Sequence, residues 1–152
     1  MSIGDATQKR IAAQANAFKV AAIQMASGPN VSGNLSEARR LIANAVEQGA
    51  KLVVLPEFFA IMGMSDQDKV VVREKPGQGP IQDFLSEIAK EFRIWVVGGS
   101  IPLEASAPDK VLNSCLVFDE YGEQVARYDK IHLFNLELGN ESYQEANTIE
   151  SG

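Results

Sequence analysis

The chain has 152 residues, of which 45% are hydrophobic and 22% charged, a composition typical of one folded domain with a real core. Its net charge of -6 and its scattered lysines and arginines argue against a nucleic-acid surface, because phosphate binding requires clustered cations. A single cysteine excludes an internal disulfide, so we expect the protein to be located in a reducing cytoplasm. One cysteine and one histidine are too few for a zinc site, and we expect no metal and no cofactor.

Residues 1–17 do not contain the apolar core of a secretory signal, because Gln14 and Asn16 interrupt the segment. No apolar run reaches the roughly 20 residues that a transmembrane helix requires. We therefore expect a mobile or weakly helical extension over 1–17, one domain over 18–152, and no contact with a membrane.

The first half of the domain has the pattern of a β-α-β unit. Residues 19–25 are expected to form a strand, and the helix that follows begins at an approximate capping box of Asn34 and Glu37. Gly49 stands where this helix should stop. Residues 51–55, apolar after Lys51, are then expected to form a second strand, parallel to the first.

A long connection over 60–79 precedes the clearest amphipathic helix, which begins at Pro80. Connections of this length are more often lids over a site than plain turns. Gly77 and Gly79 at its end resemble a phosphate loop, but no Lys-Ser/Thr pair follows them. Helix entry is therefore the preferred interpretation.

Three further strands are expected after this helix. They cover residues 94–99, 111–118 and 123–129, with a polar loop over 103–110. The last two strands flank a turn at 119–122 and form a hairpin. The predicted order is β-α-β-α-β-β-β, an α/β fold without an interior linker.

The acidic residue Glu57 lies in the otherwise apolar segment LPEFFAIMG. Burying an unpaired carboxylate costs several kcal/mol, so Glu57 must either reach water or have a partner. Pro56 ends the preceding strand, which places Glu57 beyond the carboxyl end of a buried strand, where α/β sheets build binding crevices. Both a working acid and a structural glutamate bonded to backbone amides or an arginine remain open.

Lys130, in the segment YDKIHLFN, follows the last predicted strand just as Glu57 follows an earlier one. If the two strand ends lie on the same edge of the sheet, the ammonium would stabilise the carboxylate and compensate its burial. The alternative is an ordinary surface lysine on a loop.

Several segments together resemble the amino-terminal half of the nitrilase superfamily, the carbon-nitrogen hydrolases. They are KVAAIQM, LVVLPEFF, the G-Q-G-P loop before a helix, WVVGGSIP, LNSCLVFDEYGE and YDKIHLF, and the resemblance covers residues 19–152. The likeness is greatest to the branch of omega-amidase and the amidase of deaminated glutathione. It implies part of a four-layer α-β-β-α sandwich, a small amide substrate, a Glu-Lys-Cys triad that acts through a thioester, and a homo-oligomer, commonly a dimer.

By this resemblance, Glu57 is the general base and Lys130 is the cation that stabilises the tetrahedral intermediate. The family has a second glutamate after the lysine, which positions the lysine and the substrate. Glu145 aligns best with it. Glu141 is the alternative, because the proline that the family has before Gly139 is absent here.

The remaining expectations concern the surroundings of the site. Phe58 and Phe59 would shield the base from water, and His132 resembles a family residue that supports the wall of the site by hydrogen bonding. Cys115 is expected to be unreactive, because it lies in an apolar strand. The family's nucleophile lies downstream of Gly152, so we expect a chain truncated before the nucleophile and inactive alone. The alternative is a noncatalytic binding or subunit module that retains the fold.

Overall fold

The computed structural model describes residues 18–139 and 141–152, so the expectation for residues 1–17 lies outside it. The main sheet contains β1 (Val20–Ala22), β2 (Leu52–Val54), β3 (Trp95–Val97), β4 (Ile101–Glu104), β5 (Val111–Phe118), β6 (Gln124–Asp129) and β9 (Ile149–Glu150). A separate hairpin consists of β7 (Asn135–Leu138) and β8 (Glu141–Gln144). The helices are α2 (Val31–Glu47), α3 (Asp68–Val71) and α4 (Pro80–Phe92), and the 3-10 turn Glu145–Asn147 precedes β9.

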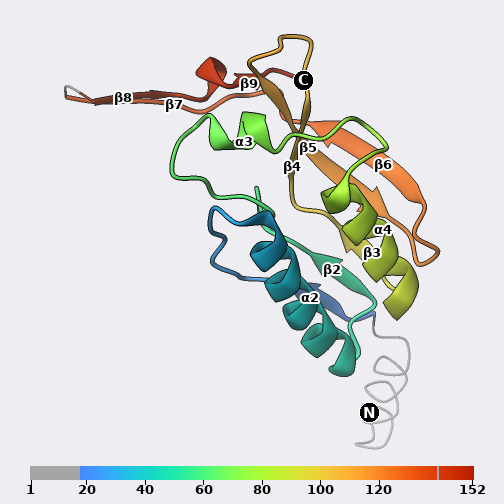
Figure 1. Ribbon diagram of the computed structural model, residues 1–152. Coiled ribbons are helices and arrows are strands. Elements are labelled where there is room, and N and C mark those ends of the chain that lie inside the picture. Colours follow the sequence, from blue (N-terminus) through green and yellow to red (C-terminus); the bar gives the residue numbers. More distant parts are fainter. Residues whose placement is uncertain (1–17, 140) are drawn as a thin grey trace, which may run out of the picture.

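The first three strands are parallel, as the predicted β-α-β pattern requires. Strand β1 pairs with β2, and β2 pairs with β3. Helices α2 and α4 form the two crossovers and lie side by side on one face of the sheet (Figure 1). Strand β5 continues the sheet in the antiparallel sense and pairs with β6, which confirms the predicted hairpin.

The hydrophobic core lies between the two helices and the sheet. Its fully buried side chains include Ala38 and Ile42 from α2, Ile81, Leu85 and Ile88 from α4, and Val53, Val96 and Leu116 from the strands. Burial of one such aliphatic side chain contributes roughly 1.5–3 kcal/mol, so this layer holds the strands in place. No helix in the described part of the chain is long and apolar enough to cross a bilayer.

The predicted start of α2 is wrong by one turn. The N-cap is Asn30, whose side-chain oxygen accepts a hydrogen bond of 2.8 Å from the N–H of Gly33. Asn34 is buried instead, and its amide donates to the carbonyls of Gly28 and Ala60 at 2.8 and 2.9 Å. Asn34 therefore ties the loop before α2 to the segment after β2.

Strand β4 is absent from the prediction, which has no element between 94–99 and the polar loop 103–110. In the structure β3 and β4 follow one another along the same edge of β5, separated by residues 98–100. Pro102 is tolerated in β4 because this strand lies at the end of the sheet order, where a missing N–H costs no ladder bond.

The PGQGP segment is a helix entry, which confirms the preferred interpretation. The buried carboxylate of Glu74 accepts hydrogen bonds from the N–H groups of Ile81 at 2.6 Å and Gln82 at 3.1 Å. It thus occupies first-turn amides of α4 that a phosphate would need. Gly79 has φ of 130°, and a Cβ there would overlap the Glu74 carboxylate.

Glu74→Ala is expected to lower the free energy of unfolding by about 1–3 kcal/mol, because buried first-turn amides of α4 lose their acceptor. Urea denaturation of this chain measures the change. The matched control is Glu87→Ala, an exposed residue of the same helix, which should change the free energy by less than about 0.5 kcal/mol. Equal effects at both positions would contradict the capping role of Glu74.

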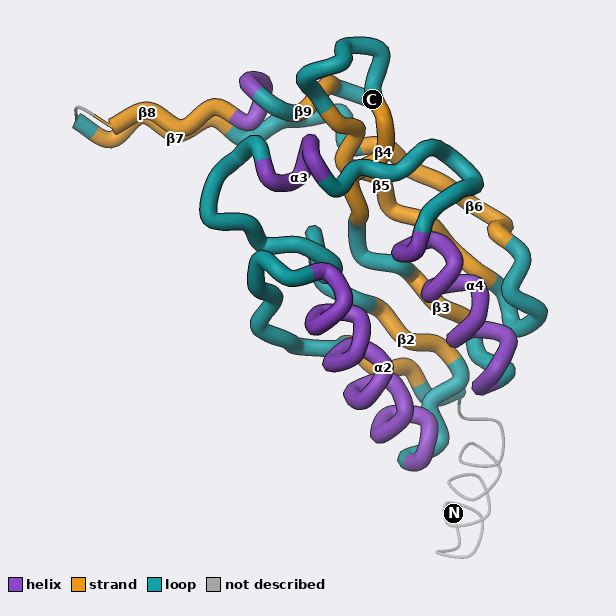
Figure 2. The backbone as a smooth tube through the Cα atoms, in the orientation of Figure 1, coloured by secondary structure: helices purple, strands orange, loops and turns teal. Residues whose placement is uncertain are grey.

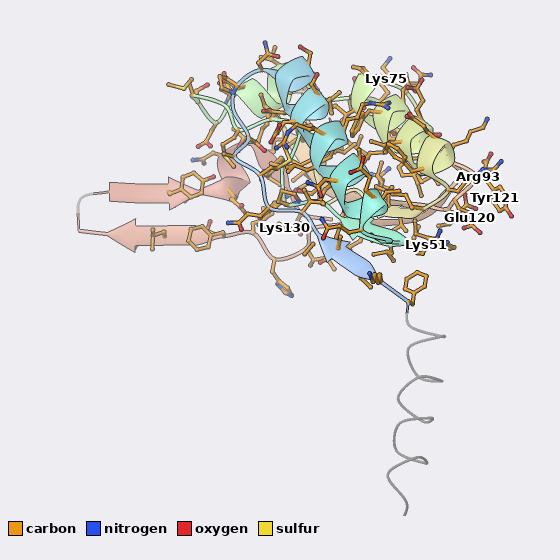
Figure 3. All side chains as sticks on the ribbon, turned by 90° about the horizontal axis from the view of Figure 1, so that it is seen from below. Lys51, Lys75, Arg93, Glu120, Tyr121 and Lys130 are labelled. Atoms are coloured by element: carbon orange, nitrogen blue, oxygen red, sulfur yellow. The ribbon has the colours of Figure 1, made fainter. Side chains whose placement is uncertain are left out.

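The opposite face of the sheet is not covered by any helix of the described residues (Figures 2 and 3). Since Val53 and Val96 point to the helices, their strand neighbours point to this other face. Val20, Trp95 and Tyr128 remain 58%, 38% and 56% exposed. The sheet therefore presents apolar side chains on its open face.

Candidate active site

The residues around Glu57 fold into a tight turn directly after β2. Phe58 has φ of 49°, and its N–H donates to the hydroxyl oxygen of Ser100 at 3.0 Å. Gly99 packs against the same turn so closely that a Cβ there would overlap the carbonyl oxygen of Pro56. The break between β3 and β4 thus fixes the backbone that carries Glu57.

Lys130 follows β6 and is fixed by its own backbone. Its N–H donates to the carbonyl of Asn113 in β5, and its carbonyl accepts from the N–H of Gly152, both at 2.9 Å. The side chain is 26% exposed. Figure 3 shows Lys130 close to the base of the β7–β8 hairpin.

The structure brings three charged side chains together at this point. The Lys130 ammonium lies 3.2 Å from Oε1 of Glu57 and 2.9 Å from Oε2 of Glu145. The predicted convergence of Glu57 and Lys130 is therefore present. Two carboxylates share one ammonium, an arrangement that favours the charged form of the lysine.

Glu145 lies in the 3-10 turn after β8, and its side chain is only 10% exposed. Its carboxylate accepts from the N–H of Phe134 at 2.7 Å, while its own N–H donates to the Phe134 carbonyl at 3.0 Å. These bonds fix the carboxylate beside Lys130. The side chain of Glu141, the alternative second glutamate, lies outside the described part of the structure.

The pKa of Lys130 is raised above the ordinary lysine value of 10.5. Burial of the ammonium acts to lower it, but the hydrogen bonds and charges of Glu145 and Glu57 outweigh that effect. Lys130 is therefore charged at neutral pH. The stability from this cluster is fully present below the ordinary lysine pKa and is lost as the pH rises through the raised pKa of the folded chain.

Glu145→Gln is expected to lower the pKa of Lys130 relative to the unchanged chain. Glutamine keeps an acceptor for the Phe134 N–H but removes the negative charge that favours the ammonium. An NMR titration of the Lys130 side-chain signals measures the change. Glu137→Gln, at an exposed position in β7, should leave the Lys130 pKa as it is. A Lys130 pKa that Glu145→Gln does not lower would count against this coupling.

The expectation that Phe58 and Phe59 shield Glu57 from water is wrong for this chain, since the Glu57 side chain is 57% exposed. Phe59 is fully buried on the helix side, with its ring centroid 6.3 Å from that of Phe84 in α4. Phe58 is half-buried. The reason is the turn at Phe58, which sends Phe59 into the core while Glu57 points to the cluster with Lys130.

Sequence analysis did not single out Asn113, which contacts Glu57 directly. Asn113 is 3% exposed in β5, and its Nδ2 donates to Oε1 of Glu57 at 2.6 Å. The sequence pattern that could have indicated Asn113 is its polar side chain in the otherwise apolar strand VLNSCLVF. Asn113 lies two positions before Cys115 and therefore on the same face of the strand. Only the pairing of the strands shows that this face meets Glu57.

Two hollows meet at Glu57. The larger has a volume of about 520 Å³, within the range of small-molecule sites, and lies between the connection after β2 and the residues Tyr143 and Glu145. The smaller, of about 240 Å³, is bordered by Asn113, Cys115 and Lys130. The long connection over 60–79 therefore supplies one wall of the larger hollow.

Lys69, on α3, is a second cation that borders the larger hollow, and its side chain is 13% exposed. Its ammonium lies 3.2 Å from Oδ1 of Asp66 and 3.3 Å from the hydroxyl of Thr148. It also lies 5.7 Å from the ring centroid of Phe58. Sequence analysis did not identify Lys69, because α3 has only four residues and no apolar period.

The structure does not bring the two remaining candidates into the cluster. His132 is exposed after β6, and among the described residues no hydrogen bond involves its side chain. Cys115 is half-buried in β5, and burial raises the pKa of its thiol, as expected for an unreactive cysteine. Within residues 18–139 and 141–152, no group of three or more His, Cys, Asp or Glu side chains is arranged to hold a metal ion.

Comparisons with known proteins agree on one family. The sequence matches the carbon-nitrogen hydrolase family over residues 19–152. It is 38% identical to human omega-amidase NIT2 over 136 residues, which covers 89% of this chain and 48% of that protein. It is 36% identical to a deaminated glutathione amidase of Synechocystis over 138 residues, which covers 89% of this chain and 50% of that protein.

The fold leads to the same family. The crystal structure of Saccharomyces cerevisiae Nit3, a member of branch 10 of the nitrilase superfamily, superposes with a TM-score of 0.74 at 31% identity, and covers 89% of this chain and 48% of Nit3. This match confirms the predicted α/β fold class. The chain spans about half the length of the relatives it matches. It belongs to the carbon-nitrogen hydrolase family, in the omega-amidase branch of the nitrilase superfamily.

Proposed function

We propose that residues 18–152 are the amino-terminal part of an amidase that hydrolyses small amides through a thioester, and that sequence outside these residues supplies the nucleophilic cysteine. The observation that supports this most is the cluster in which Lys130 lies 3.2 Å from Glu57 and 2.9 Å from Glu145. The family indicates the class of reaction, hydrolysis of a carbon-nitrogen bond. The cluster contains a carboxylate and an ammonium that suit this reaction. This chain alone is expected to be inactive.

In this proposal Glu57 is the general base and Lys130 the electrophilic cation. Glu57 takes the proton of the thiol as sulfur attacks the amide carbon, and then gives that proton to the nitrogen of the departing ammonia. Lys130 remains protonated and stabilises the negative oxygen of the tetrahedral intermediate. Water then hydrolyses the thioester with Glu57 again as the base. Glu145 holds the Lys130 ammonium in place.

The open face of the sheet supports a larger assembly. Its exposed apolar side chains, among them Val20, Trp95 and Tyr128, suit a second sheet packed on this face, as in a four-layer α-β-β-α sandwich. Such a layer would also exclude water from Glu57. The electrostatic attraction between Glu57 and Lys130 would then be stronger, because the local dielectric constant is lower. A homodimer of the complete protein and a cytoplasmic location belong to the same proposal.

We further propose that the substrate carries a carboxylate in addition to its amide. Glu57 and Glu145, which both contact Lys130, border the larger hollow at one place, and Lys69 borders it at another. Two hydrogen bonds, to Asp66 and Thr148, leave the Lys69 ammonium one further N–H for a ligand. The names of the relatives, omega-amidase and deaminated glutathione amidase, fit such substrates.

The test is an assay of the protein expressed from the complete coding sequence that contains these residues. We expect ammonia release from small amides, faster when the amide carries a carboxylate, and a covalent acyl-enzyme in intact-protein mass spectrometry. The second candidate is a noncatalytic binding module. It is favoured if the complete coding sequence supplies no further cysteine, because the one cysteine of these 152 residues, Cys115, lies half-buried in β5. Amide binding without ammonia release would support that module and contradict the amidase.

A further inference from the structure

Asn113 and Lys130 both donate to the same oxygen of Glu57. Nδ2 of Asn113 lies 2.6 Å from Oε1, and the ammonium of Lys130 lies 3.2 Å from it. Among the described residues, no donor contacts the other oxygen, Oε2. The two oxygens of the carboxylate are therefore in different environments: two donors hold Oε1, whereas Oε2 has no donor among the described residues.

The main chain of Asn113 lies between β4 and the residue that follows β6. It lies opposite Pro102 of β4, and its carbonyl accepts the N–H of Lys130 at 2.9 Å. One residue thus anchors Glu57 through its side chain and Lys130 through its main chain. A shift of Asn113 would move the base and the cation together.

The orientation of the Asn113 amide follows from its partner. A carboxylate oxygen can only accept, so the amide must turn its NH2 group toward Glu57. Its own oxygen, Oδ1, is buried and has no partner among the described residues. A buried acceptor without a partner lowers stability, so this orientation does not optimise the fold. It does optimise the contact with Glu57.

We propose that Asn113 is a positioning residue for the base. It holds Oε1 of Glu57, so that Oε2 is the atom that receives the thiol proton and later passes it to the leaving nitrogen. This inference rests on the proposed role of Glu57 as general base.

The test uses the protein from the complete coding sequence, with Asn113→Ala and the isosteric Asn113→Asp. We expect Asn113→Ala to lower kcat by about 10²-fold with little change in KM, because the base is misplaced. The acidic limb of the pH profile of kcat/KM should move to higher pH in both variants, and further in Asn113→Asp, where two adjacent carboxylates retain a proton.

Ser114→Ala is the matched control. Ser114 is the next residue of β5 and fully buried, but it points to the opposite face and donates to Asp129 at 2.6 Å. If the loss of any buried polar group only weakens the fold, Ser114→Ala will show this as a lower urea midpoint. The pH profile of kcat/KM for Ser114→Ala should nevertheless equal that of the unchanged enzyme. Should Asn113→Ala fail to fold, Asn113→Asp carries the test, because it retains the shape of the side chain.

The outcomes separate this inference from the proposed function. If Glu57→Gln is inactive but both Asn113 variants keep the kcat and the pH profile of the unchanged enzyme, the positioning role is wrong and the base assignment stands. If the unchanged protein releases no ammonia, or Glu57→Gln is fully active, the proposed function is wrong and the role of Asn113 with it. The inference is supported if the acidic limb of the kcat/KM profile shifts in the Asn113 variants and does not shift in Ser114→Ala.

Discussion

Glu57→Gln is expected to abolish thioester formation in the complete enzyme while leaving the fold intact. Glutamine keeps an oxygen that accepts from Asn113 and Lys130, but its amide cannot take the proton of a thiol. The loss of general-base catalysis should lower the rate of acylation by about 10²–10⁴-fold. Because the Glu57 side chain is 57% exposed, its replacement removes little packing, and the urea midpoint should change little.

Acylation is measured by rapid quenching followed by intact-protein mass spectrometry, which counts the acyl-enzyme directly. Glu47→Gln, at an exposed position at the end of α2, is the control for a lost surface charge and should acylate at the normal rate. Acyl-enzyme that accumulates at the normal rate in Glu57→Gln would rule out Glu57 as the base. Normal acylation with slow release of the carboxylic acid product would point instead to a role in hydrolysis of the thioester.

The sequence predicts β1, β2, β3, β5 and β6 of the main sheet, but not β4 or β9, because those five strands are encoded locally. The hairpin over 111–129 has an apolar run and a more polar strand-like segment on either side of a turn with glycine, and the structure places its strands at Val111–Phe118 and Gln124–Asp129. Pro56 ends β2, so Glu57 is placed at a strand end by chain chemistry alone. The amphipathic period of α4 likewise sets its start at Pro80. These predictions need no knowledge of which strands pair.

The parts that were missed depend on long-range pairing. Asn113 lies 56 residues from Glu57 in sequence, and its contact exists only because β5 lies beyond β3 in the sheet. The start of α2 was missed for a different reason. Asn30 and Asn34 are the same residue type four positions apart, and only the burial of Asn34 decides which one caps the helix. Local patterns carry neither piece of information.

The β7–β8 hairpin and the exposure of Glu57 show a further limit. Strands NLEL and ESYQ have only four residues each, too few to establish a period, so no strand was predicted there. The turn after them nevertheless carries Glu145 to Lys130. The resemblance to the family aligned Glu145 with a supporting glutamate but did not give its contacts. The apolar neighbours Phe58 and Phe59 led to the expectation that Glu57 is shielded from water, but its side chain is 57% exposed in this chain.

Lys130→Ala is expected to lower kcat of the complete enzyme by about 10²-fold or more, by analogy with the loss of other groups that stabilise an oxyanion. The raised pKa of Lys130 means that its charge is present throughout the neutral range, so the loss should not depend on pH there. The Glu145 carboxylate, 10% exposed, also loses its cation. The variant should therefore unfold at a lower urea concentration as well, since a buried charge without a partner is costly.

These two effects of Lys130→Ala are separated by measuring kcat under conditions where the variant is fully folded, with circular dichroism as the check. The matched control is Lys51→Ala, an exposed lysine next to β2 that Figure 3 labels far from the hairpin, and it should change neither kcat nor stability. The double variant Lys130→Ala with Glu145→Gln removes the uncompensated charge. It should regain stability but not kcat, because the cation that faces the developing oxyanion is still missing. An unchanged kcat in folded Lys130→Ala would count decisively against the electrophilic role.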